Sequence, residues 1–430
     1  MKYLKIKRNQ LLDDGTAPIT GIEYIIDNDT DLYFSMSDNR PMDNNWEQVH
    51  KIPTSGKYMV LLRTFVGFHE DTEIIKSKKY NEFFERILTD LKNDRCMLVT
   101  WSNDFTDTLL ILKTESFLKK NNINPKNFVT INMTYISNIE QYNMKHKVLF
   151  LQHFFGIQDT LIRSFQNEID EDAYEDLDLK GLRPEMLTEF SKRLFLNQLK
   201  YKRPNKFISY NGSPRHHRIY LLKFLYENNL LKHGIYSFFA TSYCNLNRED
   251  VVHTIEEYVD KDTEIYNKIM EIIPISLDNL PNEYGSWGED VNLQAHYSSY
   301  LEIVAETTWD QLHDSCTLTE KTGKPLFTGL PFILLARPYG LKLLKQYGFK
   351  TFHPFIDESY DDVIDCDKRL EMIFNEIKRI LNMNEEEIHK WFLSMKGILY
   401  HNIKHFHSFI YKNQIDIKCG IEESWNVFNK

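Results

Sequence analysis

Glycine is scarce in this chain, which contains 16 glycines among 430 residues, fewer than the roughly 7% of an average protein. The glycine-dependent patterns G-x-G-x-x-G, G-x-x-x-x-G-K-[ST] and G-x-S-x-G are all absent. Such patterns use glycine to bring the backbone close to a phosphate or to turn it sharply at a nucleophile. The sequence therefore lacks the best evidence for a nicotinamide-dependent enzyme, a P-loop NTPase or an α/β-hydrolase.

Patterned cysteine is also lacking, because the five cysteines are scattered and form no C-x-x-C pair. An odd, unpatterned set of thiols is typical of a reducing compartment and gives no support for a zinc site. No apolar run reaches the ~20 residues that a membrane span needs, and the first 15 residues contain no signal-peptide core. We therefore expect a cytoplasmic protein without a membrane span.

Positive charge is in deficit, with a formal net charge of -10. This balance argues mildly against a surface built to grip a nucleic-acid backbone. Hydrophobic residues at 42% and charged residues at 27% are typical of a globular protein. The length is sufficient for two domains, each with its own core.

Short apolar segments alternate with helical patterns along the whole chain, which predicts an α/β fold with parallel sheets covered on both faces. In the first half, strands are expected at 57–68, 96–101, 127–133 and 147–152, and helices at 80–91, 106–121 and 184–199, with an acidic loop at 168–178. In the second half, strands are expected at 206–210, 234–239, 300–306, 332–336 and 349–352, and a helix at 214–232.

The expected organisation is two Rossmann-like domains that face a cleft, followed by amphipathic helices. The domains are predicted at 1–200 and 201–382, and 383–430 forms a helix and tail that packs across them. Apolar residues recur at three- and four-residue steps in 367–381 and 385–411. Asn384 is the predicted N-cap of the second of these helices.

No metal site is expected. Asp-x-Asp pairs hold divalent metals in many sugar-nucleotide enzymes, but 62 acidic residues make chance pairs common, and none here directly follows a clear apolar strand. The pairs are Asp27/Asp29, Asp29/Asp31, Asp176/Asp178, Asp260/Asp262 and Asp365/Asp367. We interpret His401, His405 and His407 as ordinary helix residues, since no carboxylate lies at a matching step.

The segment 206–225 has the features of a strand–turn–helix anion site. Asn211 begins the turn, Ser213 has the chemistry of an N-cap, and Pro214 suits the first helical position. Arg215 and Arg218 would add two guanidinium groups near the positive end of the helix dipole. The alternative interpretation is an exposed basic helix start.

A second candidate site is TLTEKTGKPLFTGLPFILLARPYG at 317–340. Thr319 is predicted to cap a helical turn that carries Glu320 and Lys321. The lysine would meet a phosphate, and the glutamate would accept hydrogen bonds from a sugar or ribose hydroxyl. Pro325 lacks an N–H group, so we expect this turn to end there. The alternative is that Lys321 is a solvated surface residue.

Taken in this order, the two segments resemble the donor-binding half of the fucosyltransferase family. The resemblance covers roughly residues 206–360, and 338–352 also looks like bacteriophage proteins of this kind. The matching residues are Ser209, Asn211 and Arg218, then Ala305-Glu306, Thr319-Glu320-Lys321 and Gly329. The family's donor-contacting Tyr is Thr317 here, and the Asn after Glu306 is Thr307.

The resemblance implies a GT-B glycosyltransferase whose C-terminal domain binds a GDP-sugar, with inversion and without a cofactor or metal. The donor-binding residues that it and the segment chemistry indicate are Asn211, Ser213, Arg215, Arg218, Glu306, Thr317, Thr319, Glu320 and Lys321. The general base is expected after an N-terminal strand, at Asp104 or Glu70. The partners would be a nucleotide-sugar donor and a glycan, protein or nucleic-acid acceptor.

Two alternatives stay open at this stage. One is a phage glycosyltransferase that modifies DNA, which would occupy the host cytoplasm. The other is a non-catalytic interaction protein with a degenerate sugar-nucleotide fold, which the replacement of the family's Tyr by Thr317 supports.

Overall fold

The computed structural model describes residues 2–5, 47–49, 55–63, 78–101, 108–132, 134–136, 139–150, 184–212, 214–238, 252, 255–273, 291, 293–309 and 315–430. Over these ranges the chain is a mixed α/β protein with parallel sheets and eleven α-helices. It divides into two compact units. The described residues up to 150, together with 411–430, belong to the first unit, and those from 184 to 410 belong to the second.

The first unit contains a parallel sheet of six strands in the order β2-β1-β3-β4-β5-β7. The strands are β1 (Lys2–Lys5), β2 (Glu47–Val49), β3 (Tyr58–Arg63), β4 (Cys96–Trp101), β5 (Phe128–Asn132) and β7 (Lys147–Phe150). The last four are the strands predicted from the apolar segments. The short strands β1 and β2 were not predicted.

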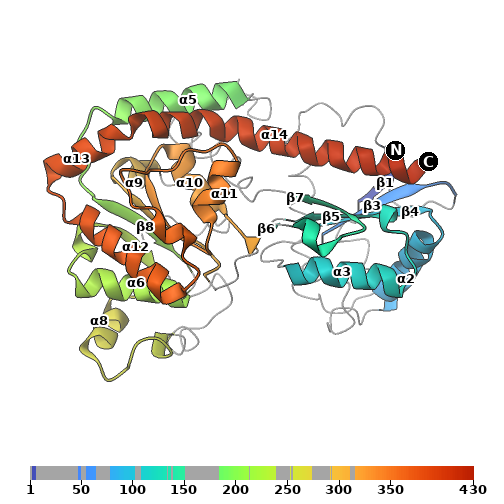
Figure 1. Cartoon of the computed structure of the whole chain (residues 1–430), viewed down its shortest axis with the longest axis horizontal. Helices are drawn as coiled ribbons and strands as arrows, with labels where there is room; N and C mark the ends of the chain where they lie inside the picture. Colours follow the sequence, from blue (N-terminus) through green and yellow to red (C-terminus); the bar gives the residue numbers. More distant parts are fainter. Residues whose placement is uncertain are drawn as a thin grey trace. The chain divides into compact units, whose positions relative to one another are not determined.

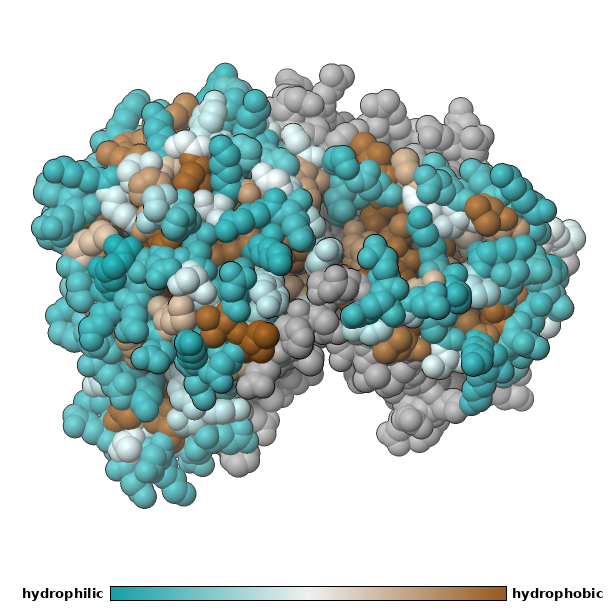
Figure 2. Space-filling model, viewed as in Figure 1, coloured by the Kyte–Doolittle hydropathy of each residue, from teal (hydrophilic) through white to brown (hydrophobic). Residues whose placement is uncertain are grey.

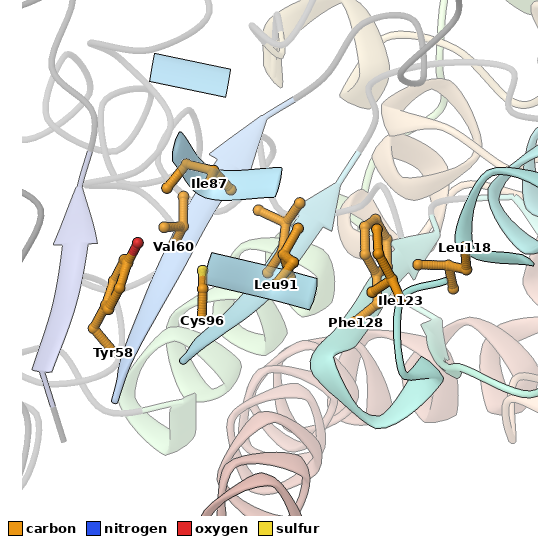
Figure 3. Packing of buried hydrophobic residues seen from close by; sticks show 9 residues of the cluster. Tyr58, Val60, Ile87, Leu91, Cys96, Leu118, Ile123 and Phe128 are labelled. Carbon is orange, nitrogen blue, oxygen red and sulfur yellow. The ribbon is translucent and has the colours of Figure 1, made fainter. Parts of the chain in front are cut away.

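Helices α2 (Lys78–Lys92) and α3 (Thr108–Lys120) follow β3 and β4 in the chain. Figure 3 shows how Ile87 and Leu91 of α2 meet Val60 and Cys96 of the strands in the hydrophobic core of this unit. Ile87 and Leu91 are four positions apart, so they lie on one face of the helix, as the sequence pattern predicts. Tyr58 at the end of this core donates its hydroxyl to Asp90 Oδ2 at 2.7 Å.

The second unit contains a parallel sheet of four strands in the order β12-β10-β8-β9. The strands are β8 (Phe207–Asn211), β9 (Gly234–Phe238), β10 (Glu302–Ala305) and β12 (Phe332–Leu335), and all four were predicted. Strands β6 (Tyr135–Ile136) and β11 (Ser315–Cys316) have two residues each.

The fifth strand predicted for this half, 349–352, is not a strand. Two of its backbone N–H groups donate to side chains instead of to a neighbouring strand, and that of Phe349 donates to Leu344 O at 3.0 Å. Lys350 N donates to Asn402 Oδ1 at 2.8 Å, and Phe352 N donates to Glu358 Oε1 at 2.5 Å. The apolar residues of the segment are nevertheless buried, since Phe349 and Phe352 belong to the core. The apolar pattern thus reported burial correctly, and the type of element wrongly.

Helices lie on both faces of the four-stranded sheet, with α6 and α12 on one side and α9 and α10 on the other (Figure 1). The helices of this unit are α5 (Pro184–Gln198), α6 (His216–Glu227), α8 (Glu264–Ile272), α9 (Leu293–Tyr297), α10 (Glu320–Thr328), α11 (Gly340–Gln346), α12 (Cys366–Leu381) and α13 (Glu385–Ser394). Helix α5, expected within the segment 1–200, belongs to this unit. Its Ser191 is hydrogen-bonded to His407 at 3.2 Å.

The tail is helical, as predicted, but the expected helix 385–411 is divided. Asn384 caps α13 in a capping box with Glu387, and the helix ends at Ser394, with Met395 as its C-cap residue. A second helix, α14 (Lys396–Asn429), begins directly afterwards and is longer than expected. Its residues up to 410 belong to the second unit and those from 411 to the first. The predicted apolar stripe is buried, for example at Phe392 and Phe406.

No helix in the described part of the chain is long and apolar enough to cross a membrane. On the face drawn in Figure 2, hydrophilic side chains cover most of the coloured surface, and apolar ones form small separate patches.

Candidate functional site

The two segments singled out in the sequence meet at one edge of the four-stranded sheet. Because its strands are parallel, their carboxyl ends lie at the same edge, where open α/β sheets bind ligands. Asn211 ends β8, which leads into α6, and Glu306 follows β10. The start of α10 lies against Glu306, since Thr319 contacts the carboxylate of Glu306. The fold therefore unites residues about a hundred positions apart.

The carboxylate of Glu306 accepts four hydrogen bonds and is fully buried. Its Oε1 accepts the Thr319 N–H at 2.9 Å and the Thr322 hydroxyl at 2.5 Å. Its Oε2 accepts the Thr319 hydroxyl at 2.7 Å and the Thr307 N–H at 3.4 Å. A carboxylate at this place suits the positive end of the α10 dipole. Glu306, one of the residues predicted to bind a donor, holds the start of α10 in place through these bonds.

Thr319 caps α10 as predicted, because its hydroxyl accepts the Lys321 N–H at 3.3 Å. The Lys321 ammonium lies beside this cap, 3.3 Å from Thr319 Oγ1 and 3.5 Å from Thr307 Oγ1. It is also 2.5 Å from Glu320 Oε1. The side chain of Lys321 is 22% exposed, so solvent reaches it, but any bound anion has to compete with Glu320.

The prediction that Pro325 ends the first turn of this helix was wrong, since α10 continues to Thr328 with Pro325 inside it. A proline removes one backbone hydrogen bond, and its own carbonyl oxygen still accepts from Gly329 N and Leu330 N at 3.0 Å each. Gly329 then ends the helix in the left-handed conformation, with a φ of 71°.

Helix α6 begins two residues later than predicted. Arg215 is the N-cap residue, with extended φ and ψ of -137° and 149° and no side-chain cap hydrogen bond, and His216 is the first helical residue. Pro214 therefore precedes the helix and does not occupy its first position. Ser213, the predicted cap, lies outside the described residues, as do Asp104 and Glu70.

Arg218 is buried behind the ends of the strands and is not on an open helix face. Its Nη2 donates to the carbonyl oxygens of Ala305 at 3.0 Å and Glu306 at 3.3 Å. Burial, with the nearby charge of Arg215, lowers the pKa of Arg218 to about 10, which still leaves it protonated at neutral pH. Part of the guanidinium fork predicted to bind phosphate is thus engaged by the protein.

His217 lies beside Arg218 and was not singled out from the sequence. Its Nε2 donates to the Glu306 carbonyl oxygen at 2.8 Å, and its ring stacks on Trp309 at 5.6 Å between centroids. Burial and the charge of Arg218 lower the pKa of His217 well below its ordinary value, so the ring is neutral. The one sequence signal that could have pointed to His217 as a site residue is its position next to Arg218.

Asn211 and Thr317 are both buried. Asn211 Nδ2 donates to Ser209 Oγ at 3.0 Å, and that hydroxyl donates to Ile303 O at 2.7 Å. The Asn211 N–H donates to Ser237 Oγ at 3.1 Å. Asn211 and Ser209 together therefore connect β8 to its two neighbours, β9 and β10. Its Oδ1 is buried and has no hydrogen-bond partner among the described residues.

The three tail histidines have structural partners. The Nε2 groups of His401 and His405 donate to the carbonyl oxygens of Gly348 and Tyr347, at 2.9 and 2.6 Å, just beyond the end of α11. Of the Asp-x-Asp residues, Asp365 caps α12 by accepting the Lys368 N–H at 2.8 Å. Within the described ranges, no group of three or more His, Cys, Asp or Glu side chains is placed to hold a metal ion.

No protein-family profile matches the sequence, and no curated protein is significantly similar to it.

Proposed function

We propose that the protein is a glycosyltransferase of the GT-B type, and that its second unit binds a nucleoside-diphosphate sugar, with a GDP-sugar favoured. One observation carries this proposal. Two segments with phosphate-binding chemistry, predicted separately, meet at the carboxyl edge of a parallel sheet and are joined there through Glu306. Arg215, Arg218 and Lys321 bring three positive charges to this edge, against the two carboxylates of Glu306 and Glu320.

The proposed reaction needs cations because negative charge grows on the departing diphosphate. Lys321 at the start of α10 and the arginines at the start of α6 would stabilise that charge without a metal or a cofactor. The acceptor is a hydroxyl group of a glycan, protein or nucleic acid, and Asp104 or Glu70 of the first unit is the proposed base. In this proposal the two units are the two domains of a GT-B enzyme, located in the cytoplasm, and transfer inverts the anomeric centre.

The short contact between Lys321 and Glu320 at 2.5 Å favours one alternative, a non-catalytic protein with a degenerate sugar-nucleotide fold. In that case the charge of Lys321 is paired with Glu320 and does not bind a ligand. A phage enzyme that glycosylates DNA is a further version of the main proposal, distinguished by strongly salt-dependent binding to DNA.

A thermal-shift experiment with nucleoside diphosphates tests the proposal. A ligand that binds only the folded protein stabilises it by about 2.7 kcal/mol at a hundredfold excess over its dissociation constant. We expect GDP to raise the melting temperature more than UDP does, and inorganic sulfate to have little effect. If no nucleoside diphosphate shifts the melting curve, the donor-site proposal is wrong.

A further inference from the structure

Glu306 is bonded to both halves of the candidate site. Its carbonyl oxygen accepts His217 Nε2 and Arg218 Nη2, which come from the start of α6. Its carboxylate accepts the N–H and hydroxyl of Thr319 and the hydroxyl of Thr322, which come from the start of α10. Its own N–H donates to Leu335 O at 2.9 Å, so β12 fixes it as well. A single residue therefore connects the two groups of proposed phosphate ligands.

The side chain of Glu306 cannot reach a ligand in this arrangement, because it is fully buried and both oxygens are used by protein donors. Burying a charge is costly, and an apolar side chain often stabilises a core better. The best-attested reason to keep a buried charge is that it fixes one arrangement over its competitors. Here the fixed arrangement is that of the α10 N-terminus relative to the end of β10.

We propose that Glu306 is a positioning residue that couples the start of α6 to the start of α10, so that order in one half of the site imposes order on the other. The effect on ligand binding rests on the proposed function. The coupling itself is a property of the protein without ligand, so it can be tested separately.

Thr322→Val is the sharpest probe of this coupling. The change removes the hydroxyl that donates to Glu306 Oε1 and keeps the shape of the side chain, and Thr322 is fully buried, so it touches no ligand. Thr322→Ser retains the hydroxyl and should behave like the wild type. If the Val variant does not fold, Glu306→Gln supplies the second probe, because the amide keeps the shape but has one accepting oxygen fewer.

The first measurement is amide hydrogen exchange of the full chain without ligand. We expect Thr322→Val to speed exchange roughly fivefold in peptides from the start of α10 and also from the start of α6. The factor corresponds to the loss of one net hydrogen bond. Asn384→Ala is the control, since it breaks the capping box of α13 and should leave α6 unchanged. Faster exchange in α10 alone, with α6 as in the wild type, would overturn the coupling.

The second measurement is the dissociation constant of GDP. Thr322→Val should weaken GDP binding about fivefold, although position 322 is buried and does not contact the ligand. Thr322→Ser should bind GDP as tightly as the wild type. A purely structural role would lower the melting temperature and leave the dissociation constant unchanged, which would contradict the inference. If the wild type binds no nucleoside diphosphate at all, the proposed function fails, and the exchange experiment still decides whether Glu306 couples the two helices.

Discussion

His407 should make the second unit sensitive to acid. The residue lies on α14, is fully buried, and packs edge-on against Phe327 and Phe406 at ring distances of 5.9 and 5.5 Å. Its Nε2 is hydrogen-bonded to Ser191 Oγ at 3.2 Å, and its Nδ1 has no partner among the described residues. Burial lowers the pKa of His407 to about 3.

The direction of the effect follows from proton linkage. Between about pH 6.5 and pH 3 the unfolded chain protonates this histidine and the folded protein does not, so stability falls as the pH falls. At pH 4.5, two units below the ordinary histidine pKa of about 6.5, the loss is about 2.7 kcal/mol relative to neutral pH. The loss would be complete near pH 3.

The assay is urea unfolding at pH 7 and pH 4.5. His407→Gln cannot be protonated in this range, so it should lose about 2.7 kcal/mol less than the wild type between the two pH values. Ser191→Ala is the matched control, because it removes the hydrogen bond and keeps the titrating ring, and it should lower stability similarly at both pH values. Equal acid sensitivity of the wild type and His407→Gln would refute the reasoning.

Three further predictions concern the candidate site and its support. Lys321→Ala should lower the turnover of a nucleotide sugar on the order of 10²–10³-fold with little change in stability, and a variant with wild-type turnover would remove Lys321 from the site. Gly329→Ala should lower the free energy of unfolding by more than about 1 kcal/mol, because φ is 71° and a Cβ would lie 2.6 Å from Ile403 Cδ1 and 2.7 Å from Phe195 Cδ2; an unchanged urea midpoint would contradict this. Turnover should persist in excess EDTA. If EDTA abolished turnover and manganese restored it, the mechanism would have to be metal-dependent.

Most of the sheet strands could be predicted from the sequence, because a strand that is buried on both faces consists of an almost continuous run of apolar residues. The segment 349–352 was predicted as a strand and its two phenylalanines are buried, yet it is not a strand, because Asn402 and Glu358 accept the N–H groups of Lys350 and Phe352. Those partners come from 6 and 52 residues away. Apolar pattern alone reports burial and carries no information about such partners.

The sequence singles out two segments that the fold brings together at Glu306, but it does not indicate what each of their residues contacts. Thr319 as a cap follows from local chemistry, and the structure agrees. The functions of Glu306 and Arg218 depend on which elements meet at the sheet edge. A carboxylate that accepts from α10 and a guanidinium that donates to the end of β10 cannot be distinguished by sequence from side chains that face a ligand.

The most direct test of the central claim is calorimetric titration of GDP into the wild type and Lys321→Ala. GDP is the leaving group of the proposed reaction and carries its full negative charge, so it should interact with Lys321 more strongly than the intact nucleotide sugar does. Since a hydrogen bond to a charged group contributes about 1.5–3 kcal/mol, the variant should bind GDP roughly 10- to 150-fold more weakly. Lys268→Ala, which removes a lysine paired with Glu271 on α8, should bind like the wild type. Equal affinity of the wild type and Lys321→Ala, or no binding to either, would contradict the account.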